Sequence, residues 1–165
     1  MSTNGNALRW LWLAAAVIVL DQATKAWVVA TFELFEVLPV LPVFDLTRLH
    51  NPGAAFSFLA TASGWQRWFF IALATGISIG IVAWLRQLPA RGQSVLACGL
   101  ALVMGGAIGN VIDRVMHGYV IDFIHLHWND AYFPAFNVAD SGITVGAGLL
   151  ILDALLEGRR RHAAP

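Results

Sequence analysis

The sequence predicts a mainly helical membrane protein with four transmembrane helices and a small extracytoplasmic β-sheet. Hydrophobic residues make up 58% of the 165 residues and charged residues only 12%, and the mean hydropathy is +0.68. A soluble domain needs far more charge on its surface. Four apolar stretches approach the roughly 20 residues with which a helix crosses a bilayer. We therefore expect one integral membrane domain over residues 1–165.

The four expected spans cover about residues 10–32, 68–85, 95–112 and 141–156. Asp21 and Lys25 interrupt the first span, but they are four residues apart, so on a helix they share a face and partly neutralise each other. A cleavable signal peptide is the alternative for this span. It is disfavoured because no small-x-small cleavage site directly follows the apolar run and the hydrophobicity resumes at Ala26.

The basic residues predict the orientation. In a four-span arrangement, six of the ten Lys and Arg residues share one side of the membrane: Arg9, Arg86, Arg91, Arg159, Arg160 and Arg161. Because basic residues favour the cytoplasmic side, we expect both termini there. Residues 33–64 and 113–139 are then extracytoplasmic segments.

The first extracytoplasmic segment has the pattern of extended chain. Pro39 and Pro42 interrupt any helix, and residues 43–49 alternate polar with apolar side chains. This predicts a small sheet at the membrane surface, whereas we expect the second segment to be a loop. The run after Asn51 begins Pro-Gly and continues with small residues. It fits either a simple turn or a close approach to a helix or ligand.

Glycines four residues apart recur in the last three spans. The pairs are Gly76 with Gly80, Gly105 with Gly109, and Gly142 with Gly146. Small residues at this spacing let helix backbones approach closely in a membrane, so all three pairs predict close helix packing. The single cysteine, Cys98, lies in an apolar stretch and is interpreted as packing.

Two aspartates, Asp122 and Asp140, lie at or beside the membrane ends of spans. A carboxylate near hydrocarbon is costly and needs a partner or a function. Two such groups held together in a pocket of low dielectric share a proton and titrate as a pair. One can then accept a proton from water while the other donates one, which is the chemistry of peptide hydrolysis without a covalent intermediate. The alternative for Asp140 is a helix N-cap.

Further polar residues are expected on the same side of the membrane: Asp21, Asn51, Asn110, Arg114 and Asn137. Arg114 could hold a carboxylate through two hydrogen bonds, or could form an interfacial charge pair with Asp113. Asn110 lies inside the third span and needs partners, because its amide has four hydrogen-bonding sites.

The motifs of metal sites, serine hydrolases and nucleic-acid-binding proteins are weak or missing in the sequence. His125 and His127 flank Leu126, but the sequence has no His-Glu-x-x-His motif, so no metal site is expected. A serine hydrolase elbow is also missing. Nothing in the charge pattern indicates nucleic-acid binding.

Five short motifs, in order, together resemble the lipoprotein signal peptidases, also called signal peptidase II, which are bacterial membrane aspartyl proteases. They are Asp21-Gln-Ala-Thr-Lys25, Asn51-Pro-Gly-Ala-Ala-Phe-Ser57, Gly105-Gly-Ala-Ile-Gly-Asn-Val-Ile-Asp-Arg114, Val120-Ile-Asp-Phe123 and Phe136-Asn-Val-Ala-Asp-Ser141. Each motif alone is weak, whereas five in the family's order are specific.

The resemblance implies that Asp122 and Asp140 form the catalytic pair and that Asp21 supports the site, pairing with Arg114. The remaining matched residues would bind substrate or support the site: Lys25, Asn51, Gly53, Asn110, Arg114 and Asn137.

It also implies a substrate and a location. The substrate would be a prolipoprotein whose cysteine carries diacylglycerol, cradled by the extracytoplasmic sheet and cut just before that cysteine. The enzyme would work in the bacterial cytoplasmic (inner) membrane, among membrane lipid, without a metal or organic cofactor. Cyclic peptides of the globomycin type would occupy the aspartate site.

Two alternatives belong to other classes of protein. In a small proton-coupled transporter, Asp21, Asp122 and Asp140 would relay protons. The sequence shows no obvious inverted repeat, and its polar residues gather toward one side of the membrane instead of the midplane, which disfavours a transporter. A structural subunit of a larger complex would leave a partner's activity intact when either aspartate is replaced.

Overall fold

The computed structural model of the chain describes residues 6–53 and 64–163, so residues 54–57 of the second motif lie outside the described residues. The elements in chain order are η1 (Ala7–Trp10), α1 (Leu11–Thr31), β1 (Val37–Leu41), β2 (Phe44–Asn51), α2 (Trp65–Gln87), α3 (Ser94–Met116), β3 (Val120–Trp128), β4 (Ala131–Tyr132) and α4 (Val138–Ala163).

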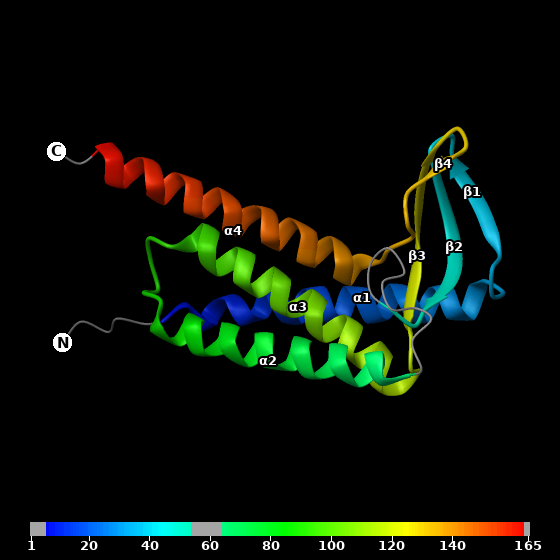
Figure 1. Cartoon of the computed structure of the whole chain (residues 1–165), viewed down its shortest axis with the longest axis horizontal. Coiled ribbons are helices and arrows are strands. Elements are labelled where there is room, and N and C mark those ends of the chain that lie inside the picture. Colours follow the sequence, from blue (N-terminus) through cyan, green and yellow to red (C-terminus); the bar gives the residue numbers. More distant parts are fainter. Residues whose placement is uncertain (1–5, 54–63, 164–165) are drawn as a thin grey trace.

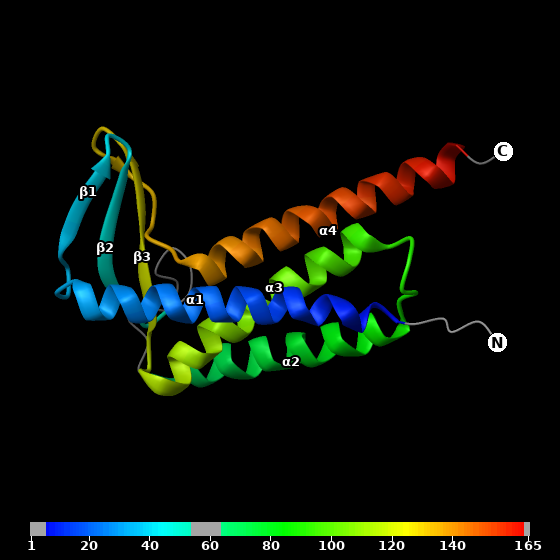
Figure 2. The same ribbon diagram turned by 180° about the vertical axis from the view of Figure 1, so that it is seen from behind.

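Each of the four long helices is long and apolar enough to cross a membrane. They run lengthwise together, with the sheet at one end and both chain ends at the other (Figure 1), and the view from behind shows the same arrangement (Figure 2). The fold class expected from the sequence is confirmed. The helices are longer than the apolar stretches: α3 continues to Met116 and α4 begins at Val138. Asp113, Arg114 and Asp140 are therefore helix residues.

Helix α3 is the central helix, because it contacts α1, α2 and α4. Its glycines allow these contacts. A methyl group on Gly105 would lie 2.8 Å from the carbonyl oxygen of Ala14 in α1, and one on Gly106 would collide with the carbonyl oxygen of Ala139 in α4. Farther along, a methyl group on Gly146 would lie 2.7 Å from the carbonyl oxygen of Gly99. Close packing of small residues thus brings the helix backbones together.

The same expectation is wrong for α2. A methyl group on Gly76 or Gly80 would meet no atom within 4 Å among the described residues. The spacing of the two glycines does place them on one face of the helix, but no described helix approaches closely at either glycine. Helical spacing therefore predicts which residues share a face, whereas the tertiary structure is needed to show whether that face contacts another helix.

The sheet is antiparallel, in the order β1-β2-β3-β4. Strands β1 and β2 come from residues 33–64, for which extended chain was expected. The second segment was expected to be a loop, but it contributes β3 and β4. The run Val120-Ile-Asp-Phe-Ile is rich in β-branched and aromatic residues, which accounts for the additional strand. In the β2–β3 register, Leu49 lies opposite Asp122 and Asn51 opposite Val120.

An apolar cluster anchors the sheet to the helices. Val28 and Phe32 at the end of α1 pack with Ile121 and Phe123 of β3, and all four are buried. Ile121 and Phe123 flank Asp122 in the sequence. Burial of the residues on both sides of Asp122 therefore holds this part of β3 against the helix bundle.

Candidate active site

The two aspartates singled out in the sequence face one cavity of about 650 Å³. Asp122 comes from the buried half of β3 and is itself 3% exposed. Asp140 comes from the first turn of α4 and is half-buried. The structure thus brings together two carboxylates that are separated by a strand, a turn and an irregular segment in the chain.

Hydrogen bonds between backbones bring α4 beside β3. The amides of Phe123 and Ile124 both donate to the carbonyl oxygen of Phe136, at 3.0 and 2.8 Å, and the Phe136 amide donates back to Ile124. Asn137 follows directly and is completely buried. Its position beside Asp122 is therefore set by main-chain pairing.

Asn137 contacts both aspartates. Its side-chain amide donates to Oδ1 of Asp122 at 2.7 Å and to the carbonyl oxygen of Ile121 at 3.2 Å. Its Oδ1 accepts from the backbone amide of Asp140 at 2.9 Å, while Oδ2 of Asp140 accepts from the backbone amide of Asn137 at 3.3 Å. This reciprocal pair is a capping box at the start of α4. Asn137 occupies the N-cap position that was considered for Asp140.

Two more asparagines hold the other carboxylate oxygens. Nδ2 of Asn51 donates to Oδ2 of Asp122 at 3.0 Å. Nδ2 of Asn110 donates to Oδ1 of Asp140 at 2.8 Å, and its Oδ1 accepts from Asn137 at 3.3 Å. Every oxygen of the two carboxylates therefore receives an N–H donor from an asparagine, which orients both groups.

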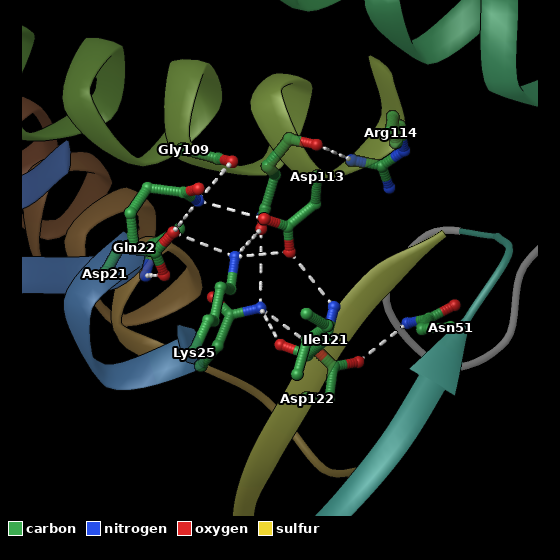
Figure 3. A network of polar contacts seen from close by, with 12 residues as sticks. Asp21, Gln22, Lys25, Asn51, Gly109, Asp113, Arg114, Ile121 and Asp122 are labelled. Atoms are coloured by element: carbon green, nitrogen blue, oxygen red, sulfur yellow. Dashed lines mark hydrogen bonds and ion pairs between the residues drawn. The ribbon is translucent and has the colours of Figure 1, made fainter. Parts of the chain in front are cut away.

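Behind the aspartates lies a buried network that joins α1 to α3 (Figure 3). Nζ of Lys25 lies 2.8 Å from Oδ2 of Asp21 and 2.8 Å from Oδ2 of Asp113. It also donates to Oδ1 of Asn110 at 3.1 Å. The resemblance implied that Asp21 pairs with Arg114, but Asp21 pairs with Lys25. The proposed charge pair between Asp113 and Arg114 is also not the one formed, because Asp113 pairs with Lys25 as well.

Arg114 binds backbone carbonyls. Its guanidinium donates to the carbonyl oxygen of Gly53 at 2.7 Å and to that of Asn110 at 3.2 Å, and it lies 5.0 Å from the ring centroid of Phe70. The two-bond contact with a carboxylate that the sequence suggested is therefore replaced by carbonyl contacts. Arg114 ties the chain after Asn51 to α3, and because Asn51 contacts Asp122, this tie supports the site from the side of β2.

The rest of the cavity is mostly apolar. Its walls come from α2, from the segment between β4 and α4, and from α4, with Phe70, Leu73, Ile77, Phe133 and Ile143 among the lining residues. The polar groups lie at the end nearest the sheet. The cavity therefore combines apolar walls with the two carboxylates.

The histidines do not gather into a metal site in the part of the chain that the structure describes, where no group of three or more potential His, Cys, Asp or Glu ligands occurs. Nε2 of His127 lies 3.4 Å from Oδ2 of Asp45. The rings of His125 and His127 each lie 5.1 Å from the ring of Tyr132. These contacts belong to the far part of the sheet.

A sequence profile of the family described as signal peptidase (SPase) II matches residues 13–156. The chain belongs to the signal peptidase II family. It is 50% identical over 161 residues to a lipoprotein signal peptidase of Shewanella pealeana, covering 96% of this chain and 94% of that protein. It is 48% identical over 156 residues to one of Yersinia enterocolitica, covering 94% and 92%.

Two solved structures of bacterial membrane enzymes share the fold. A bacterial membrane enzyme structure obtained by the in meso method at 2.3 Å resolution has a TM-score of 0.80 and 30% identity, with 95% of this chain and 93% of that chain covered. A second, at 1.9 Å resolution, has a TM-score of 0.76 and 30% identity, with 89% and 92% covered. Membership makes the chain an aspartic-type peptidase, and its four apolar helices make it a multi-pass protein of the bacterial inner membrane.

Reasoning from the sequence missed two residues that the structure places in the buried network behind the two aspartates. Asp113 was considered only as an interfacial charge, and Gln22 was not singled out. Nε2 of Gln22 donates to Oδ2 of Asp21 at 3.1 Å and to Oδ1 of Asp113 at 2.9 Å. Both residues lie within quoted motifs, so the motif spacing was the available signal. Their pairing depends on how α1 crosses α3.

Burial, together with the neighbouring charge of Asp140, raises the pKa of Asp122 from 3.8 to about 7, although the hydrogen bonds from Asn51 and Asn137 and the charge of Lys25 lower it. An unfolded chain releases this proton near pH 4, whereas the folded enzyme keeps it until about pH 7. Stability therefore falls as the pH rises between these values, since the folded state binds the additional proton.

This predicts a pH-dependent effect of Asp122→Asn on stability. An amide cannot ionise, so the variant does not lose stability through this group as the pH rises. We expect its thermal unfolding temperature in detergent to exceed that of the wild type by a margin that grows from pH 4.5 to pH 7.5. A margin that is constant over this range would contradict a raised pKa of Asp122 in the folded enzyme.

Proposed function

We propose that this protein is an intramembrane aspartyl endopeptidase that removes the signal peptide from diacylglyceryl-modified prolipoproteins, cutting just before the lipidated cysteine. The observation that carries the proposal is the position of Asp122 and Asp140 together at the polar end of an apolar cavity. A lipid-modified substrate needs an apolar path, and hydrolysis of its peptide bond needs an acid and a base at the end of that path.

The two carboxylates would divide the acid and base roles between them. The raised pKa of Asp122 favours a pair that shares one proton near neutral pH. The ionised partner takes a proton from water, whose oxygen attacks the carbonyl carbon of the scissile bond. The protonated partner donates to the carbonyl oxygen. When the carbon–nitrogen bond then breaks, a proton passes to the leaving nitrogen.

The remaining site residues would hold this arrangement or bind the substrate backbone. Asn51, Asn110 and Asn137 orient the carboxylates through the hydrogen bonds described above. Arg114 and Gly53 support the chain that carries Asn51, since Arg114 donates to the Gly53 carbonyl. Arg114 also lines the cavity, where a guanidinium stabilises negative charge on a substrate oxygen. Asp21 and Lys25 act from behind the cavity.

The chain would form one membrane domain with the site facing the extracytoplasmic side. Both ends of the chain lie opposite the sheet (Figure 1), and the basic residues near those ends favour the cytoplasm. All five residues of β1 are exposed, and four of them are Val or Leu. An exposed apolar strand fits a sheet that rests on the membrane surface and cradles the substrate. Globomycin-type cyclic peptides would bind in the same cavity.

The direct test compares a diacylglyceryl-modified prolipoprotein with its unmodified form, incubated with the purified enzyme in detergent. We expect cleavage of the lipidated substrate only, with the cysteine as the first residue of the product by mass spectrometry. Equal cleavage of both forms would contradict a requirement for the lipid. If neither form is cut, the peptidase proposal fails, and proton uptake into proteoliposomes would test the transporter alternative.

A further inference from the structure

Three buried charged residues lie directly behind the two aspartates, and we name them the Lys25 cluster: Asp21, Lys25 and Asp113. Their exposed fractions are 0%, 2% and 1%. The residues that line the active-site cavity include none of the three. Lys25 is the only lysine in the sequence. The cluster is therefore placed to act on the site without touching a substrate.

Each carboxylate of the cluster binds the backbone amide of the residue just before a site aspartate. Oδ2 of Asp113 accepts from the amide of Ile121 at 3.0 Å, and Ile121 precedes Asp122. Oδ1 of Asp21 accepts from the amide of Ala139 at 2.9 Å, and Ala139 precedes Asp140. Both of these hydrogen bonds are buried. The same ammonium, Nζ of Lys25, lies 2.8 Å from each carboxylate.

We infer that the Lys25 cluster sets the relative position of Asp122 and Asp140, with Asp21, Lys25 and Asp113 acting as positioning residues. The inference rests on the proposed catalytic role of the aspartate pair. Asp113 holds the strand that carries Asp122, and Asp21 holds the helix turn that carries Asp140. Because Lys25 is bonded to both Asp21 and Asp113, one side chain couples the segments that carry the two site aspartates.

The neighbouring groups leave the cluster little freedom. Lys25 donates to Oδ1 of Asn110 at 3.1 Å, which turns the amide nitrogen of Asn110 toward Asp140. Gln22 bridges the two cluster carboxylates. A methyl group on Gly109 would lie 2.8 Å from Oδ2 of Asp21, so glycine leaves the space that the carboxylate occupies. Without the ammonium, two buried carboxylates would repel each other and lose their common partner.

The first experiment measures hydrogen exchange of the backbone amides in the detergent-solubilised full chain, for the wild type and for Lys25→Met. We expect the amides of Ile121 and Ala139 to exchange at least about tenfold faster in the variant, because local opening becomes easier. The amide of Phe123, which donates to Phe136, serves as the internal control and should stay protected. Asp45→Asn changes a buried carboxylate beside His127 and should leave Ile121 and Ala139 protected.

A second variant covers the case in which Lys25→Met does not fold. Asp113→Asn keeps an oxygen acceptor for Ile121 but loses the ion pair with Lys25. If the cluster couples its two ends, exchange at Ala139, on the Asp21 side, should rise in this variant. Unchanged exchange at Ala139 in Asp113→Asn, or at both amides in a folded Lys25→Met, would overturn the inference.

Kinetics of prolipoprotein cleavage separate positioning from a general loss of structure. We expect Lys25→Met to lower kcat by about 100-fold, the cost of misplacing reacting groups by about 1 Å, with KM nearly unchanged because the cavity lining is intact. Burial sets the raised pKa of Asp122, and the charges of Lys25 and Asp140 act on it in opposite directions. Loss of the ammonium should therefore move the limb of the pH profile that reports Asp122 to higher pH, whereas Lys25→Arg should restore its position.

The outcomes distinguish this inference from the proposed function. If the wild type does not cleave lipidated prolipoprotein, the proposed function fails, while the exchange experiment still tests the cluster. If the wild type cleaves and Lys25→Met lowers kcat without a change in amide exchange or in the pH profile, the cluster has no positioning role and the inference is wrong.

Discussion

Asparagine in place of Asp122 or Asp140 is expected to lower the rate of prolipoprotein cleavage by at least about a thousandfold, within the range that general acid–base catalysis contributes. Asparagine keeps the shape of the side chain and an oxygen that accepts hydrogen bonds, but it cannot exchange a proton near neutral pH. With one carboxylate missing, the site lacks either the base that activates water or the acid that donates to the carbonyl oxygen of the scissile bond. We expect comparable losses from the two variants, because the carboxylates act as a pair.

The measurement is a gel-shift assay of cleavage with purified enzyme in detergent, under single-turnover conditions. Asp153→Asn is the matched control, because Asp153 lies on the same helix as Asp140 but 13 residues farther along, about 20 Å at the rise of an α-helix. It should cut at the wild-type rate. Cleavage by either folded dyad variant at the wild-type rate would show that the assignment of the pair is wrong.

The second large effect is expected at Asn137. Replacement by alanine removes the side chain that contacts both aspartates, and it leaves the buried Ile121 carbonyl without its Asn137 donor. We expect the cleavage rate to fall by at least about 100-fold, because both carboxylates lose an orienting partner. The variant should also be less stable, by about 1 kcal/mol for the lost helix cap and about 1–3 kcal/mol for the unpaired buried group.

Asn137→Ser separates the role of Asn137 as a helix cap from its role in orienting the carboxylates. A serine oxygen accepts from the Asp140 amide, so the cap is retained. Serine is too short to reproduce the three donor contacts of the asparagine amide. Thermal unfolding in detergent should therefore show that Asn137→Ser is more stable than Asn137→Ala, whereas its cleavage rate should stay low. Recovery of the rate together with the stability would mean that Asn137 acts only as a helix cap.

Composition and hydropathy alone predicted the membrane fold class, because every segment that crosses the bilayer must be apolar and must pair its own backbone N–H and C=O groups. A helix of about 20 apolar residues meets both requirements through local hydrogen bonds, so it can be recognised without knowledge of its neighbours. The ends of the helices were less predictable. Asp113 and Arg114 continue α3 beyond the apolar stretch, where helical structure is compatible with a polar surrounding.

The partners of the charged residues required the tertiary structure. Lys25 and Asp21 are four apart on one helix, and the sequence predicted their proximity for that reason. Lys25 and Asp113 are 88 positions apart, and their contact depends on the crossing of α1 and α3. The same dependence explains why Arg114 was paired wrongly with Asp21, and why Gly76 and Gly80 were assigned to a contact that they do not form.

The class of fold, the four apolar helices and the motifs that carry the two aspartates could all be predicted from the sequence, since these depend on residue type and local spacing. Three features became visible in the folded chain alone: Asn137 links Asp122 to Asp140, both aspartates face one cavity, and Lys25 joins the segments behind them. Side chains from distant segments meet only where helix packing and strand pairing bring their backbones together, and no local pattern encodes that geometry.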